Sequence, residues 1–91
     1  MVVIMDKVKK FRKVCEDCSA RLWSHEIFDE DNNLVRVDVE DYSNAKKIMG
    51  VAEELGFRRE EYFEHTHNIA LAFDVGSLKE KFFPRVEWKL F

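Results

Sequence analysis

The sequence predicts a single α+β domain over residues 1–91, built as a two-layer sandwich in which an antiparallel sheet carries two main helices on one face. Two patterns predict this fold. Residues 34–40, LVRVDVE, alternate valines with charged side chains, as a strand does when one of its faces is buried. Residues 45–55 place small and apolar side chains three and four positions apart, as an amphipathic helix does.

The first half of the chain is expected to supply a strand, a helix and a hairpin. Residues 2–5, VVIM, form an apolar run that predicts a short buried strand. A helix should begin at Asp6, whose carboxylate can cap it, because apolar side chains follow at helical spacing: Val8, Phe11, Cys15, Cys18 and Leu22. Residues 22–28, LWSHEIF, predict the next strand, and the polar turn at 29–33 joins it to residues 34–40.

The clearest predicted element is the helix over residues 45–55. Asp41 or Ser43 can cap its start, because both side chains accept hydrogen bonds from free backbone N–H groups. Gly56 can adopt the left-handed conformation that ends a helix, and Phe57 supplies the apolar contact that usually follows it.

The remaining residues predict a second hairpin, a helical turn and a last strand. The hairpin strands are expected at 57–66 and 69–75. Ser77 can cap a single helical turn at 78–82, and residues 85–91, RVEWKLF, alternate again as a strand. The element order resembles that of the ferredoxin-like fold with extra strands at the C-terminus, and this fold hosts many unrelated functions.

The turn of the second hairpin decides which face of the sheet His65 occupies. If His67 and Asn68 form a two-residue turn, His65 lies with Phe63 on the face opposite Ile69. If the loop holds three residues, His65 joins the face of Ile69. A slip of one residue moves every side chain to the opposite face, so both registers stay open.

Composition narrows the classes of function. The formal net charge is −3 with both signs mixed along the chain, so there is no long-range attraction for nucleic acid. No apolar run is long enough to cross a bilayer and no secretory signal opens the chain, which predicts a cytoplasmic protein without a membrane partner. A charged fraction of 36 % without glutamine is typical of a thermophile's protein.

Two pairs of residues have the chemistry of metal ligands. Cys15 and Cys18 are spaced as Cys-x-x-Cys, and His65 and His67 point the same way if they lie on a strand. Zinc binds such thiolate and imidazole groups, so a zinc-stabilised protein is one hypothesis. The alternative is that the cysteines pack as small hydrophobes on the apolar stripe of their helix, and the stripe favours it.

The segment HTHNIALAF also resembles the His-hydrophobic-His strand of rolling-circle replication endonucleases and relaxases, in which two histidines bind a metal ion for DNA nicking. The resemblance implies a divalent-metal nuclease that uses His65 and His67. Here Thr66 stands at the hydrophobic position, and Tyr42 precedes the histidines, whereas that family's nucleophilic tyrosine follows them. No catalytic residue is therefore assigned.

The aromatic residues are the strongest indication of function. A core of this size has difficulty enclosing eight phenylalanines, two tryptophans and two tyrosines, so some rings should form a surface for association. The candidates are Tyr62, Phe63, Trp88 and Phe91. We therefore expect a non-catalytic interaction or regulatory module that binds a protein partner or forms a homodimer. The alternative is an RNA-binding domain that stacks bases on Tyr62 and Phe63.

Overall fold

The computed structural model of the chain describes residues 3–24 and 32–83 and confirms the α+β class. The four strands form one antiparallel sheet in the order β1-β2-β4-β3. The elements, in chain order, are α1 (Val3–Asp17), β1 (Arg21–Trp23), β2 (Leu34–Val39), α2 (Tyr42–Glu54), β3 (Arg58–Glu64), β4 (Ile69–Asp74), the 3₁₀ helix η1 (Gly76–Leu78) and α3 (Lys79–Phe82).

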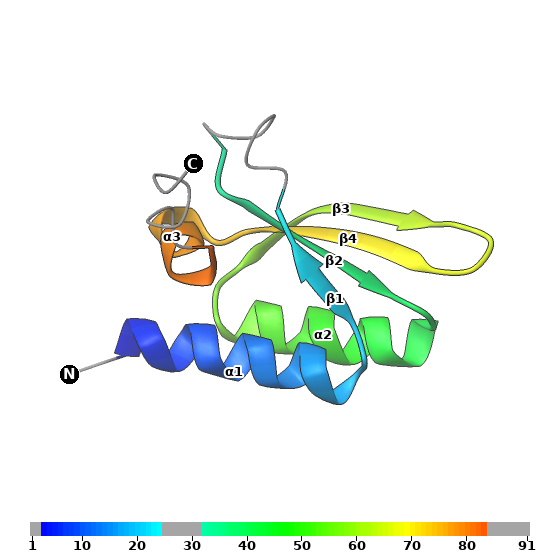
Figure 1. Cartoon of the computed structure of the whole chain (residues 1–91), viewed down its shortest axis with the longest axis horizontal. Helices are drawn as coiled ribbons and strands as arrows, with labels where there is room; N and C mark the ends of the chain where they lie inside the picture. The colour runs from blue at the N-terminus through cyan, green and yellow to red at the C-terminus, as the bar shows by residue number, and fades with distance from the viewer. Residues whose placement is uncertain (1–2, 25–31, 84–91) are drawn as a thin grey trace, which may run out of the picture.

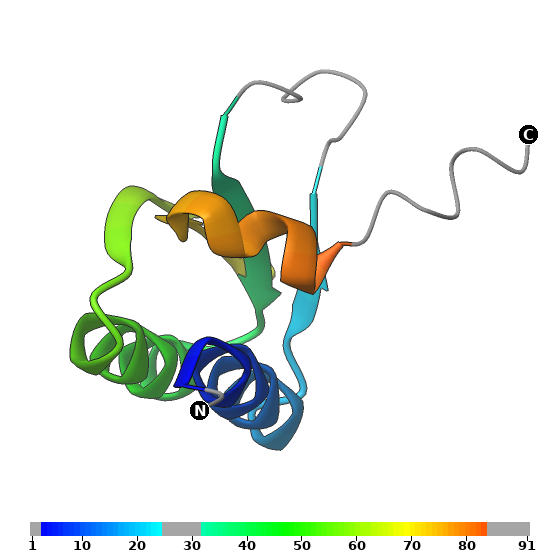
Figure 2. The ribbon, with the colours of Figure 1, turned by 90° about the vertical axis from the view of Figure 1, so that its left-hand side faces the viewer.

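Helices α1 and α2 lie against one face of the sheet. Figure 1 shows both helices on the same side of the strands, and Figure 2 shows them as neighbours seen nearly end-on. The valines predicted to alternate in β2 line this face, and each is at most 1 % exposed: Val35, Val37 and Val39. Each pairs with an apolar residue of β4, which continues the buried face across the sheet: Phe73, Leu71 and Ile69, respectively.

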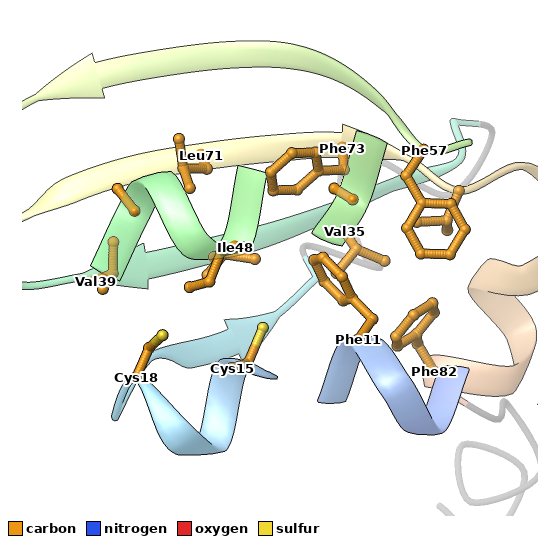
Figure 3. Close-up of a cluster of buried hydrophobic side chains, with 14 of the residues drawn as sticks. Phe11, Cys15, Cys18, Val35, Val39, Ile48, Phe57, Leu71, Phe73 and Phe82 are labelled. Atoms are coloured by element: carbon orange, nitrogen blue, oxygen red, sulfur yellow. The ribbon is translucent and has the colours of Figure 1, made fainter. Parts of the chain in front are cut away.

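Phe11 of α1 lies at the centre of the core. Its ring makes edge-to-face contacts at centroid distances of 5.5 Å to Phe57, 5.5 Å to Phe73 and 5.8 Å to Phe82. Figure 3 shows these rings pointing toward one another. They come from α1, from the residue before β3, from β4 and from α3, so one aromatic cluster connects four parts of the chain.

The strand predicted at residues 2–5 is wrong, because α1 begins at Val3. A run of four apolar residues has no period of its own and fits either a strand or a buried helical turn. Ile4 stands four positions before Val8, so the helical spacing of α1 extends back into this run. The ferredoxin-like order is not confirmed, because the strand that should open it is helical from Val3.

Helix α1 also ends earlier than predicted, at Asp17 instead of Leu22. Its end is a Schellman motif, in which the Ser19 N–H donates to the Glu16 carbonyl at 3.0 Å and the Ala20 N–H donates to the Cys15 carbonyl at 2.8 Å. Ser19 takes the left-handed position with φ 54°. The chain then turns directly into β1, so Leu22 joins the sheet.

Helix α2 confirms the predicted caps. The Asp41 carboxylate accepts a hydrogen bond from the Asn44 backbone N–H at 2.8 Å, which is the N-cap interaction. Gly56 has φ 81°, and Phe57 follows it into the core. The helical turn predicted at 78–82 is confirmed as α3, but no side chain caps η1 or α3, so the predicted capping role of Ser77 is wrong.

Some predictions lie outside the described residues. They are most of the strand at 22–28, most of the turn at 29–33 and the whole strand at 85–91, with Trp88 and Phe91. The described part of the first hairpin is confirmed, because β1 pairs with β2 in antiparallel register. Among residues 3–24 and 32–83, no helix is long and apolar enough to span a membrane.

Candidate functional site

The second hairpin turns at Thr66 and His67, one residue earlier than predicted. The His65 N–H donates to the Asn68 carbonyl at 2.8 Å, and Glu64 is the partner of Ile69 in the ladder. Ile69 therefore pairs with Glu64 instead of Thr66, which is a shift of two residues along the strand. A shift of two keeps every side chain on its face, so the faces predicted for a two-residue turn are confirmed. His65 lies on the face of Phe63, with their ring centroids 4.6 Å apart, and this face is opposite that of the buried Ile69.

Strand β3 lies at an edge of the sheet. It pairs with β4 on one side, and no strand from the described parts of the chain pairs with its other side. A β-bulge between Arg59 and Glu61 interrupts the register near its start, whereas residues from Glu61 to Glu64 pair regularly with β4. The regular half of β3 therefore offers an open backbone edge to another strand.

Phe63 is the most exposed large hydrophobic side chain in the described parts of the chain, at 61 %. It faces away from α1 and α2, because it pairs with Ala70 and not with the buried residues of β4. Its neighbour Tyr62 is half-buried and packs against the core on the other face. The two rings therefore lie on opposite faces of the sheet, and of these two only Phe63 could stack on a ligand of the open face.

The open face of the sheet carries charges that are paired with one another. Arg36 Nη1 lies 3.2 Å from Glu61 Oε2, across the small residue Ala72 of the strand between them. Arg58 Nη2 lies 3.6 Å from Asp74 Oδ2. The pairing of Arg36 and Arg58 with carboxylates weakens the attraction of this face for a phosphate backbone.

Trp23 adds a second aromatic ring to the open face. It pairs with Arg36 in the ladder, and its Nε1–H donates to Asp38 Oδ2 at 3.0 Å. The guanidinium of Arg21 lies 5.9 Å from the centroid of its ring. The ring is thus held by polar neighbours and is half-buried, which leaves Phe63 as the more accessible ring of this face.

The two cysteines belong to the core, as the helical stripe predicts. Cys15 is 2 % exposed and Cys18 is 4 % exposed, and both thiols are free. Burial raises the pKa of the Cys15 thiol from 9.0 to about 12, and burial also raises the pKa of Cys18. A zinc ligand must be a thiolate, so this environment opposes the ionisation that metal binding requires.

The structure does not gather the four predicted metal ligands into one site. His65 and His67 are exposed at the end of the second hairpin, in an open hollow that Glu40, Asp41 and Glu64 also line. Within residues 3–24 and 32–83, no group of three or more His, Cys, Asp or Glu side chains is placed to hold a metal ion.

Tyr42 is an exposed aromatic residue that the sequence did not single out as a contact residue. It is the first residue of α2, directly after the Asp41 cap, and it is 55 % exposed. The ammonium of Lys46 lies 5.7 Å from the centroid of its ring. The exposure of Tyr42 could have been predicted from the sequence, because Tyr42 lies off the apolar stripe of its helix and such a residue tends to face solvent.

Comparison with protein-family models, with curated proteins and with solved structures finds no significant match to this chain.

Proposed function

We propose that this domain is an interaction module without catalytic activity, that it forms a homodimer, and that the regular half of β3 carries the contact. The observation that carries the proposal is the coincidence of an exposed Phe63 with an open backbone edge. An apolar ring gains by leaving water, and an unpaired strand gains by completing its ladder. A single contact along the second half of β3 would both bury the Phe63 ring and complete the ladder of this edge.

The first half of β3 has features that natural proteins use to protect an edge. It carries Arg58, Arg59 and Glu60 in succession, and the bulge bends the backbone there. The second half lacks a bulge and places Tyr62 and Phe63 next to each other. This contrast within one strand supports a contact at the second half.

The alternatives have weaker support. The RNA-binding alternative stacks bases on Tyr62 and Phe63, but these two rings lie on opposite faces. The Trp23 ring shares the open face with Phe63 but is half-buried, and Arg36 on that face is paired with Glu61. A metal-dependent role would need either ionised thiols or a further ligand beside His65 and His67. We therefore keep both as alternatives to the interaction module.

Light scattering coupled to size-exclusion chromatography tests the proposal with one variant and one matched control. We expect a dimer for the unaltered chain and a monomer for Phe63→Asp, because a charge replaces a ring that the contact buries. Loss of a buried phenylalanine contact is worth roughly 1.5–3 kcal/mol, or about 10- to 100-fold in the dissociation constant.

Tyr42→Asp is the control, because it charges the other large exposed ring, which begins α2 on the helix side of the sheet, opposite the face that carries Phe63. It should remain dimeric, and circular dichroism should show all three proteins folded. A monomeric unaltered chain at high micromolar concentration would rule out the homodimer. A dimer that tolerates Phe63→Asp would move the contact to another surface.

A further inference from the structure

We propose that two copies of this chain pair through β3 in one antiparallel register, with Phe63 opposite Phe63 of the partner subunit at the two-fold axis. The inference rests on the proposed homodimer and specifies its geometry. The two sheets then join into one continuous sheet, because a two-fold axis perpendicular to the sheet reverses the strand direction and keeps the same face of each copy on the same side.

The backbone of the hairpin determines which residues can bond across the edge. The His65 N–H points toward β4, since it donates to the Asn68 carbonyl. Backbone groups of an antiparallel strand alternate in direction, so those of Phe63 and Glu61 also point toward β4. The N–H and C=O groups of Tyr62 and Glu64 therefore point outward at the open edge.

The register centred on Phe63 uses these outward groups. Tyr62 falls opposite the partner's Glu64, and the two residues form a hydrogen-bonded pair in the new ladder. The two Phe63 residues form a non-hydrogen-bonded pair, in which opposed side chains approach most closely. Within one chain the Tyr62 hydroxyl already donates to Glu64 Oε1 at 2.7 Å, so this tyrosine and carboxylate are compatible neighbours.

The side chains next to the axis are complementary in the same register. Glu61 falls opposite the partner's His65, on the open face of the joined sheet. By symmetry this pair occurs twice in the dimer. One carboxylate–imidazole pair lies on each side of the two Phe63 rings. An imidazole N–H can donate a hydrogen bond to a carboxylate, and a cross-strand pair of aromatic rings stabilises an antiparallel ladder.

The neighbouring registers lose this complementarity. A register centred on Glu61 or on Glu64 places two carboxylates opposite each other at the axis. A register centred on Tyr62 sets Glu61 against the partner's Phe63. Registers shifted by an odd number of residues pair the open face of one copy with the helix face of the other.

A cysteine scan at positions 61 to 65 measures the register directly. Five variants are made one at a time, from Glu61→Cys to His65→Cys, and each is oxidised under mild conditions. A residue crosslinks to its own copy only if it lies at the axis, where Cα atoms of a non-hydrogen-bonded pair are about 4.5 Å apart. We expect Phe63→Cys to form a disulfide dimer at least tenfold faster than the other four.

The unaltered chain is the control, because Cys15 and Cys18 are buried and should not crosslink. Since Phe63→Cys itself removes the ring, a charge exchange provides a second measurement. Glu61→Lys and His65→Glu should each weaken dimerisation about tenfold or more, and the double variant should restore it. Glu61→Lys also removes the ion pair with Arg36 within each copy, and the double variant lacks that pair too. Dimerisation that returns in the double variant must therefore come from the contact between positions 61 and 65 of the two copies.

The outcomes separate this inference from the proposed function. Fast crosslinking at another position of the scan would overturn the register and leave the β3 dimer standing. A dimeric unaltered chain that crosslinks at none of the five positions, with no rescue by the double variant, would overturn pairing through β3. A chain that is monomeric throughout would overturn the proposed homodimer itself.

Discussion

The environment of Cys15 determines the chemistry open to its thiol. The side chain is enclosed between α1 and the sheet, among the residues that Figure 3 shows. Burial raises its pKa to about 12, so at neutral pH the thiol is protonated and a poor nucleophile. Cys18 is similarly buried, and its Sγ lies 3.8 Å from the Asn44 carbonyl, to which it donates a weak hydrogen bond. Both residues act as small hydrophobes.

The raised pKa of Cys15 predicts a loss of stability at alkaline pH. The unfolded chain releases the thiol proton near pH 9.0 and the folded chain near pH 12, so the unfolded state binds fewer protons between these values. The free energy of unfolding should therefore fall as the pH rises through this window, and it should be unaffected below it. Between about pH 8 and pH 10, we expect a loss on the order of 1 kcal/mol from this group.

Urea unfolding of the unaltered chain and of Cys15→Ala, at both pH values, measures the effect. The variant lacks the titrating thiol, so its free energy of unfolding should fall less over the same interval. Other alkaline titrations, including that of Tyr62, are common to both proteins and cancel in the comparison. Equal losses for the two proteins would show that Cys15 ionises freely in the folded chain.

At the scale of elements, the two long helices end in the same way with different residues. At the end of α2 the Gly56 N–H donates to the Glu53 carbonyl at 3.1 Å and the Phe57 N–H donates to the Ala52 carbonyl at 2.9 Å. The end of α1 repeats this pattern with Ser19 at the left-handed position. A side chain at positive φ is strained where glycine is not.

Ser19→Gly should consequently stabilise the protein. We expect the free energy of unfolding to rise by roughly 0.5–1 kcal/mol, because the substitution relieves strain at a conformation that glycine adopts freely. Gly56→Ser is the matched change at the end of α2, where no atom lies within 4 Å of a new Cβ, and it should destabilise by a similar amount. Chemical denaturation of the three proteins checks both signs. A destabilised Ser19→Gly would show that the serine side chain contributes more than its backbone strain costs.

The same two helix ends explain what the sequence could predict of the fold. Gly56 marks the end of α2 because glycine is the usual residue at this position, whereas Ser19 carries no such signal and α1 was predicted too long. The alternation of valines with charged residues was sufficient to predict β2, because a period of two is specific to strands. The run VVIM is too short to show a period of its own, and the single spacing of Ile4 to Val8 does not distinguish a helical start at Val3 from a strand.

At the scale of the whole molecule, the candidate site depends on strand order, which local patterns do not encode. Phe63 could be named from its type, but its position on an edge follows from the order β1-β2-β4-β3. The pairing of Arg36 with Glu61 depends on the same order, since β4 lies between their strands. The face of His65 could not be predicted either, because the sequence left two-residue and three-residue loops open and each places His65 on a different face.

The arrangement of the whole chain also separates the predicted metal ligands by environment. The thiols of Cys15 and Cys18 are enclosed in the core, and the imidazoles of His65 and His67 are exposed. A shared zinc site would have to expose the thiols or bury the histidines, and either change would disrupt packing around α1 or the second hairpin. The fold therefore predicts a protein whose stability does not depend on a metal ion.

Elemental analysis of the purified protein, with thermal unfolding before and after EDTA treatment, tests this expectation. We expect substoichiometric zinc and manganese and the same unfolding midpoint in both samples, because no ligand group has to release a metal for the chain to unfold. Two variants identify the ligands if metal is found: Cys15→Ser with Cys18→Ser, and His65→Ala with His67→Ala. Near-stoichiometric zinc lost in the cysteine variant would show that the thiols ionise and bind despite their burial. Metal lost only in the histidine variant would instead place a divalent ion at the end of the hairpin, beside the strand that we propose to form the dimer.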